Sequence, residues 1–302
     1  MISAAFVAAL VGYGGTIAIV LAAAQALGAT PAQTASWVMV ICFAKAIGSA
    51  TLSTMTRIPI VLAWSTPGAA LIAASQGFTM AQAVAAFGFA GLLIVATGLI
   101  PVLGRAIAAL PKALGAAMLA GVLLPLVMKA PAALAIRPQL ALPVIAIFLL
   151  VRLWNPVYAV IVALAAGLAL AVFLGVPALP VNAAHLAHPV LILPDVTLSV
   201  LISLGLPLYL VTMASQNLPG FAVLQSAGYT PPVRQALVVS GGLSSLAALF
   251  GAHPINMAAI TAAICMGPDV HPDPALRWRV GLAYGFWWVM LGLAGPFVLA
   301  VL

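Results

Sequence analysis

Long apolar segments, separated by short connections, run through the whole chain. Hydrophobic residues fill 66% of the 302 positions, whereas charged residues fill only 4%. A soluble domain carries about 25% charged residues, so this chain lacks the polar surface that a water-soluble fold needs. The segments are also much longer than the alternating stretches of about ten residues that form barrel strands. We therefore expect an all-α polytopic membrane protein with the lipid bilayer as its solvent.

About eleven segments follow from this pattern, because about 20 apolar residues cross a bilayer and a broken, buried segment needs fewer. In chain order they cover residues 3–27, 35–55, 58–75, 81–103, 111–128, 140–153, 156–176, 196–214, 233–250, 254–266 and 278–302. Basic residues are scattered between them one or two at a time, a pattern that sets topology and argues against a nucleic-acid partner. A cytoplasmic N-terminus places more of them inside than outside, and it places Arg57 and Arg277 on the same side of the membrane.

The third segment is interrupted by a Ser-Thr-Pro-Gly sequence. Residues 58–64 form an extended apolar run, and the chain continues after the interruption as an apolar run that suits a half-helix. Proline is favoured at the first position of a helix, and a hydroxyl before it caps exposed amides, so Ser65 and Thr66 predict a helix start at Pro67. Such an N-terminus presents unpaired N–H groups and a positive dipole end. This interruption therefore predicts an anion site at membrane depth.

The chain also repeats itself. The matching blocks are QALGATP at 25–31 with QSAGYTP at 225–231, Pro59, Ile60 and Thr66 with Pro254, Ile255 and Thr261, and Gly98 with Gly292. Three blocks in one order and at a nearly constant offset indicate an internal duplication. The first unit holds seven segments, an odd number, so the second must enter from the opposite side, which is the inverted repeat of secondary transporters. Counterparts of the fifth to seventh segments do not follow the eleventh, so we expect an incomplete second repeat.

Four motifs make the chain resemble the benzoate membrane transport family of proton symporters. They are AWSTPGAAL at 63–71, ASQNLPG at 214–220, NMAAITAAICMGP at 256–268 and AQALGATPAQ at 24–33. That family is similar in fold to the nucleobase and sulfate transporters, which have seven plus seven inverted segments. The resemblance implies a short strand and a half-helix in the third and tenth segments, with the substrate bound between them.

The resemblance further implies a division into two moving parts. Residues 1–104 and 196–302 would form the core, or transport, domain, residues 105–178 the gate domain, and residues 179–195 an external loop. Segments twelve to fourteen, the rest of the gate in that family, are absent from this sequence. The implied location is the bacterial inner membrane.

The implied function is secondary active import of an aromatic carboxylate, most directly benzoate, by proton symport with alternating access. Two alternatives stay open: a uniporter or channel-like anion protein on the same fold, and a truncated fragment that does not transport. We expect neither an enzyme nor a cofactor, because no nucleophile–base set is evident, and the spacing of loop histidines and aspartates does not suit a metal. The expected partners are the carboxylate, protons and the bilayer, and a homodimer is an open question.

Substrate-binding candidates lie in the two broken segments. They are Ser65, Thr66 and Gly68 in the third segment, and His253 and Asn256 in the tenth. Two half-helix N-termini that face one cavity suit a carboxylate, because backbone N–H groups bind it without a buried cation. Ser65 and Thr66 also fit simple helix capping, and His253 also fits a loop histidine with satisfied hydrogen bonds. If the assignment is right, Thr66 and Asn256 reach a common cavity near mid-membrane.

Two further groups of candidates come from the eighth and first segments. Gln216 and Asn217 are adjacent carboxamides at membrane depth, which are expensive there without partners. They would bind the substrate or satisfy carbonyls freed by the following proline. Tyr13, among glycines, would supply an aromatic wall for a substrate ring, although glycine-mediated helix packing explains the same motif.

The apolar segments contain no Asp or Glu side chain that could carry the coupling proton. Glutamate is absent, and the three aspartates, Asp195, Asp269 and Asp273, all lie outside the apolar segments. The candidates are therefore His253 and Lys45, with the substrate carboxylate itself as a further route. An intramembrane lysine is a functional candidate by default, but snorkelling towards the cytoplasmic end is the alternative for Lys45.

Overall fold

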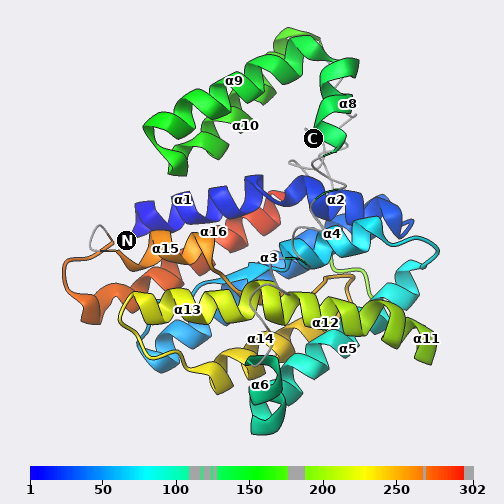
Figure 1. Ribbon diagram of the computed structural model, residues 1–302, viewed down its shortest axis with the longest axis vertical. Coiled ribbons are helices and arrows are strands. Elements are labelled where there is room, and N and C mark those ends of the chain that lie inside the picture. The colour runs from blue at the N-terminus through cyan, green and yellow to red at the C-terminus, as the bar shows by residue number, and fades with distance from the viewer. Residues whose placement is uncertain (109–116, 118–123, 125–127, 176–187, 268–269, 296–302) are drawn as a thin grey trace.

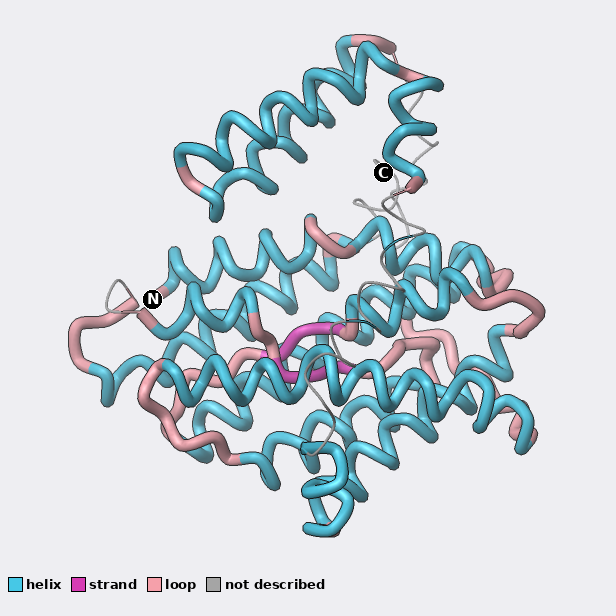
Figure 2. Tube along the Cα trace, in the orientation of Figure 1, coloured by secondary structure: helices cyan, strands magenta, loops and turns pink. Residues whose placement is uncertain are grey.

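The computed structural model describes residues 1–108, 117, 124, 128–175, 188–267 and 270–295. It is a bundle of helices around one two-stranded sheet (Figures 1 and 2). Among the described residues, four helical runs are long and apolar enough to cross a bilayer: Ile2–Ala26, Pro31–Thr56, Met80–Leu99 and Leu198–Ser226. Almost all of the predicted fifth segment and part of the predicted external loop lie outside the described residues.

The first half of the chain runs through six helices and one strand. They are α1 (Ile2–Gly14), α2 (Ile17–Ala26), α3 (Pro31–Thr56), β1 (Leu62–Trp64), α4 (Thr66–Ala74), α5 (Met80–Leu99) and α6 (Pro101–Ala108). Three more described helices follow: α8 (Lys129–Ile136), α9 (Pro138–Trp154) and α10 (Pro156–Phe173). In Figure 1 these three lie at the top of the view, where α10 packs against α9 and approaches α1.

The second half begins with one continuous helical run that contains two π-helical turns. Its parts are α11 (Leu198–Val200), η1 (Leu201–Gly205), α12 (Leu206–Thr212), η2 (Met213–Asn217) and α13 (Leu218–Ser226). The remaining elements are α14 (Val233–Ala248), β2 (Ile255–Met257), α15 (Ile260–Met266), η3 (Pro274–Arg279) and α16 (Val280–Leu293).

The two strands lie at the centre of the bundle and pair with each other (Figure 2). β1 comes from the third predicted segment and β2 from the tenth, and they run antiparallel with Ala63 opposite Asn256. Each strand is followed by a short helix, α4 after β1 and α15 after β2. The strand and half-helix expected in both broken segments are therefore confirmed.

The helices around this sheet pack in two matching pairs. α5 packs along α14, and α16 packs along α3. The fourth segment thus contacts the ninth, and the second contacts the eleventh. Each pair becomes the other when the two halves of the repeat are exchanged, as a two-fold relation between the halves requires. Small residues allow the close approach: an added Cβ on Gly241 would lie 2.7 Å from the Gly91 carbonyl oxygen. Such small-residue contacts are typical of helices packed in a membrane.

The first and eighth segments differ in detail from the sequence prediction. The first spans its predicted length as the run Ile2–Ala26, but α1 ends at Gly14 and α2 begins at Ile17, so the run is interrupted. The eighth extends beyond Ala214 to Ser226, and Gln216 and Asn217 lie within this helical run. Both irregular turns, at Thr16 and at η2, matter for the site because they contact the residues that flank the strands.

The two halves meet again at one end of the bundle. Arg57, which ends α3 in a left-handed conformation, stacks over the Trp278 ring at 4.2 Å from the guanidinium carbon to the ring centroid. Trp278 adjoins Arg277, so Arg57 and Arg277 lie at the same end of the molecule, as the topology requires. Arg277 donates to the carbonyl oxygens of Met266 and His271, which links the end of α15 to the residues before η3.

Candidate functional site

The paired strands carry backbone polar groups into the middle of an apolar bundle, where each needs a partner. Serines of the neighbouring helices supply several of these partners. On the β1 side, Ser53 exchanges hydrogen bonds with the Ile60 backbone, and Ser49 accepts from Leu62 N–H at 2.9 Å. On the β2 side, Ser244 accepts from Ile255 N–H at 3.0 Å. The same support is thus built in both halves of the repeat.

The start of α4 is fixed by a pair of buried hydroxyl groups. Ser65 caps the helix by accepting from Gly68 N–H at 3.1 Å. Its oxygen also lies 2.7 Å from the hydroxyl oxygen of Thr212, which is fully buried on α12. A Cβ on Gly68 would lie 2.6 Å from the Ser65 hydroxyl and 2.7 Å from Leu208, so only glycine fits here. The Gly68 amide is therefore occupied by the cap. The role of Gly68 is to let the Ser65 and Leu208 side chains lie close to the backbone of α4.

A second hydroxyl pair lies beside the first, at a partly exposed position. Thr66, the first residue of α4, is half-buried, and its hydroxyl oxygen lies 3.2 Å from that of Thr16. Thr16 stands in the interruption between α1 and α2. The backbone N–H of the first residue of a helix has no partner within the helix. Thr66 therefore presents two donors at the start of α4, its backbone N–H and its hydroxyl. These groups suit an anion at the positive end of α4.

Asn256 and Asn217 both bind backbone around β2. The Asn256 amide, oriented so that both of its ends are paired, accepts from Ser65 N–H at 3.1 Å and donates to Met257 O at 3.0 Å. Asn217 accepts from Met257 N–H at 2.9 Å and donates to the sulfur of Met213 at 3.2 Å. Asn256 therefore lies beside the residue that precedes Thr66, and its polar atoms are used in holding the strand crossing.

Gln216, the neighbour of Asn217, is half-buried on η2. π-helical turns inside α-helices are frequent at functional sites, because the extra residue redirects the side chains around it. The offset of about 200 that relates Gln25 to Gln225 also relates Thr16 to Gln216. Both residues thus occupy the irregular turn of the helix that passes the strand crossing in their half of the repeat.

His253 precedes β2 and is completely buried. Its Nδ1 accepts a hydrogen bond from the indole N–H of Trp37 at 2.9 Å, and the two rings meet edge to face. Because indole only donates, the neutral imidazole must carry its proton on Nε2. That Nε2 is buried and has no hydrogen-bond partner among the described residues. His253 is therefore a donor held in a fixed orientation by a partner on α3.

Lys45 is also completely buried, on the face of α3 that meets β1 and α16. Its Nζ lies 3.5 Å from the ring centroid of Trp64 and 3.0 Å from that of Trp288. Tyr13 completes the cluster, with its ring centroid 5.6 Å from Trp64 and 6.0 Å from Trp288. We call Tyr13, Trp64 and Trp288 the aromatic cage. Snorkelling, the alternative raised for Lys45, does not describe this position.

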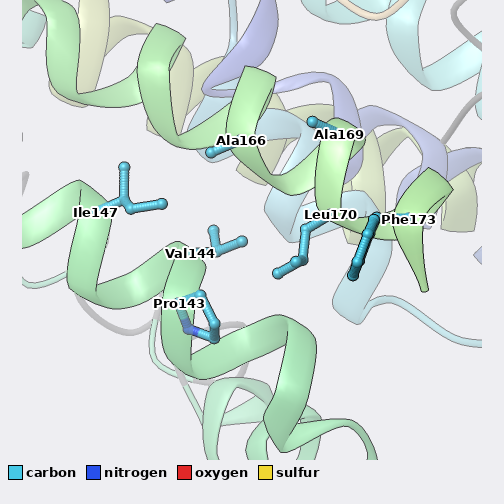
Figure 3. A pocket seen from close by; sticks show the side chains of 7 residues that line it. All are labelled: Pro143, Val144, Ile147, Ala166, Ala169, Leu170 and Phe173. Carbon is cyan, nitrogen blue, oxygen red and sulfur yellow. The ribbon is translucent and has the colours of Figure 1, made fainter.

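An apolar groove lies apart from the strands, between α9 and α10. Its volume is 430 Å³, and its lining consists of Pro143, Val144, Ile147, Ala166, Ala169, Leu170 and Phe173. Figure 3 shows these side chains facing one another across the two helices. It holds none of the polar groups that a carboxylate needs, and it suits lipid chains or another apolar surface. For metals, no group of three or more His, Cys, Asp or Glu residues occurs in the described part of the chain.

The structure therefore gathers most of the sequence candidates around the strand crossing. Ser65, Thr66, Gly68, Asn217, His253 and Asn256 lie on or beside the two strands, with Gln216 next to them, whereas Lys45 and Tyr13 form a separate cluster behind Trp64. Sequence reasoning missed Thr16, Trp37 and Thr212. The available signal was polarity within apolar segments, since each supplies a polar group at membrane depth.

Comparison with known proteins places this arrangement in a family. The family model described as Benzoate membrane transport protein matches residues 1–302, which is the whole chain. The chain belongs to this family. The Benzoate membrane transport protein of Acinetobacter baylyi is 30% identical over 300 residues, covering 99% of this chain and 76% of that protein. Inner membrane protein YdcO of Escherichia coli is 38% identical over 293 residues, covering 97% of this chain and 75% of that protein.

A solved structure has the same fold. The transmembrane domain of a cyanobacterial bicarbonate transporter, BicA, superposes with a TM-score of 0.70 at 17% identity, covering 99% of this chain and 84% of that one. At this identity the likeness concerns the fold alone. Together with the family, it confirms the predicted fold class, and the chain is a multi-pass membrane protein of a transporter family.

Proposed function

We propose that this chain is a secondary transporter that imports an aromatic carboxylate, in the first instance benzoate, together with a proton. Support comes from the family match and from the name of the Acinetobacter relative. The single structural observation that carries the proposal is the hydroxyl pair of half-buried Thr66 and buried Thr16 at the N-terminus of α4. Hydroxyl and amide donors at a positive helix end suit a carboxylate without a buried cation.

The proposed site is polar at one end and apolar elsewhere. The substrate carboxylate would bind the Thr66 amide and hydroxyl and the Thr16 hydroxyl, with Gln216 contributing from the opposite irregular turn. The buried Nε2–H of His253 is a further donor from the β2 side. An aromatic ring would then pack against the apolar walls of the strand crossing, which is the usual composition of a small-molecule site.

We further propose alternating access between two parts of the chain. Residues 1–104 and 196–302 would form the core that carries the site, and residues 105–178 would form the gate, with an external loop at 179–195 and a cytoplasmic N-terminus. The packing of α5 on α14 and of α3 on α16 supports a core that moves as one body. The apolar groove between α9 and α10 supports a gate surface that faces lipid or a second copy of the chain.

A uniporter or channel-like anion protein is the second candidate. The observation that favours it is the lack of any acidic residue in the apolar segments of the sequence. Uptake of labelled benzoate into proteoliposomes separates the two, since a symporter accumulates benzoate when the lumen is alkaline and a uniporter follows the electrical potential instead. Protein-free liposomes correct for permeation of the undissociated acid.

The site is tested by calorimetric binding of benzoate and of uncharged benzamide to the purified protein. We expect benzoate to bind and benzamide to fail. Thr66→Val should weaken benzoate binding about tenfold, or about 1.4 kcal/mol, the size of one hydrogen bond to a charged group. Thr66→Ser should restore it, and Thr54→Val, at an exposed hydroxyl on α3, should leave it unchanged. Equal binding of both ligands, or no effect of Thr66→Val, would rule out this site.

A further inference from the structure

The most unusual group in the described structure is the buried amine of Lys45. Its Nζ touches the faces of Trp64 and Trp288 and has no hydrogen-bond partner among the residues described. Two other donors of the cage, the Tyr13 hydroxyl and the Trp288 indole N–H, are likewise buried without a described partner. Aromatic faces stabilise an ammonium in part, but they supply neither a counter-charge nor a proton acceptor. The structure thus holds a titratable amine whose ionic form is not fully compensated.

Among the described residues, Lys45 has no acidic partner. The titratable groups around Lys45 are Cys42 on its own helix, Tyr13 on α1, Tyr284 on α16 and His253 before β2, with Cys265 on α15 beyond Tyr284. None of these is a carboxylic acid, and all three aspartates of the sequence lie outside the apolar segments. An uncompensated charge inside a membrane is costly and is most often tied to transport. The missing anion would therefore have to be brought in.

The cage connects this amine to the proposed substrate site. Trp64 is the last residue of β1, where it pairs with Ile255, and the next residue is the cap of α4. One face of its ring covers Lys45, and its backbone leads directly into Ser65 and Thr66. A change of charge on Lys45 thus acts on a ring whose backbone is continuous with the proposed carboxylate-binding residues.

We propose that Lys45 carries the coupling proton, and that the aromatic cage holds it where an incoming carboxylate supplies the missing negative charge. This inference rests on the proposed function. In the empty site the amine is neutral. When benzoate binds, the Nζ lone pair takes a proton from water on the loading side, and a new N–H bond forms. When benzoate leaves on the other side, that N–H bond breaks and the proton returns to water. One proton and one anion cross together, and no other reactant is needed.

The test measures proton uptake when benzoate binds to the purified full chain in weakly buffered detergent, with a pH dye as the readout. Benzoate is fully ionised near neutral pH, so uptake reports the protein alone. The wild type should take up about one proton per benzoate bound, and its Kd should rise by up to about tenfold per pH unit. Lys45→Met and Lys45→Arg, which fix the side chain as neutral or charged, should bind without uptake and with a flat pH profile. Arg234→Met, at an exposed cation on α14, should behave as the wild type.

Each outcome separates the two proposals. If the wild type does not bind benzoate, the proposed function fails. If it binds with proton uptake and either Lys45 variant keeps that uptake, the role of Lys45 is refuted. The His253→Gln variant provides a further test that does not depend on whether the Lys45 variants fold. Whatever its affinity, it should retain about one proton per benzoate, and loss of the uptake in this variant alone would assign the proton to His253 and overturn the inference.

Discussion

The buried hydroxyl pair of Ser65 and Thr212 makes a quantitative prediction about how α4 is held. Ser65 accepts from the Gly68 amide and lies 2.7 Å from the Thr212 hydroxyl oxygen, and both side chains are fully buried. Ser65→Ala removes a helix cap, which costs about 1 kcal/mol. It also leaves the Thr212 hydroxyl buried without its partner, which costs about 1–3 kcal/mol. We expect the free energy of unfolding to fall by about 2–4 kcal/mol.

Thr212→Val keeps the cap but deprives the Ser65 hydroxyl of its second partner, so we expect a loss of about 1–2 kcal/mol. The double variant contains neither hydroxyl and leaves neither unpaired. Its cost should stay near that of the lost cap, about 1–2 kcal/mol. The double variant should therefore be more stable than the sum of the single effects predicts, by about 2–4 kcal/mol.

Tryptophan fluorescence during denaturant unfolding in detergent measures these four proteins. Thr79→Ala is the matched control, because Thr79 caps α5 at an exposed helix start by accepting from Gln82 N–H. That variant should lose only the capping energy of about 1 kcal/mol. Strict additivity of Ser65→Ala and Thr212→Val, or a loss in Ser65→Ala no greater than in Thr79→Ala, would refute this account of the pair.

Three further predictions concern the elements around the site. Gly241→Ala should destabilise the protein by about 1–3 kcal/mol in the same unfolding assay, because the added Cβ would lie 2.7 Å from a backbone carbonyl oxygen of α5. The neighbouring Gly242→Ala, which meets nothing within 4 Å, should be neutral or stabilising, and equal effects would contradict the packing argument. Trp37→Phe should leave the buried Nδ1 of His253 without its donor, so nitrogen NMR of the imidazole should no longer show a single tautomer, whereas an unchanged spectrum would contradict the proposed orientation. Tyr284→Phe removes the hydroxyl that donates to the carbonyl oxygen of the first β1 residue at 3.1 Å. We expect the free energy of unfolding to fall by about 1–3 kcal/mol in thermal melts. An unchanged stability would contradict the argument that this buried carbonyl needs its partner.

Much of the fold could be predicted because a bilayer leaves few choices. Apolar length identified the segments, and the duplication together with the broken third segment predicted paired strands and half-helices. The interruption at Thr16 was missed because no proline marks it, and its glycines fit helix packing equally well. The eighth segment was ended too early because Ser215, Gln216 and Asn217 are polar. Their position inside the helix depends on tertiary partners such as the Met257 amide, which the local sequence does not reveal.

The proximity of the candidate residues could be predicted from the sequence, but the partners of their polar atoms could not. The residues beside the interruptions are indeed gathered there, since strand pairing brings residues 62–64 to residues 255–257. Which polar atoms remain free could not be predicted, because that depends on the neighbours that occupy them. Asn256 and Asn217 are used by the strand backbone, and Gly68 is used by its cap. Ser49, Ser53 and Ser244 are polar residues within apolar segments, but their backbone partners could not be inferred without the position of the strands.

The two halves of the repeat build the same frame and then differ where the site is made. In both, a strand backed by helix serines leads into a half-helix. α4 begins with a serine cap and a threonine hydroxyl, whereas α15 begins after Ala259, which provides no side-chain cap, and its first residue is 81% exposed. The two rings on Lys45 come from different halves, Trp64 from β1 and Trp288 from α16. Under the proposed function, this divergence would place the hydroxyl donors for the carboxylate at the first half-helix in both the inward and the outward state.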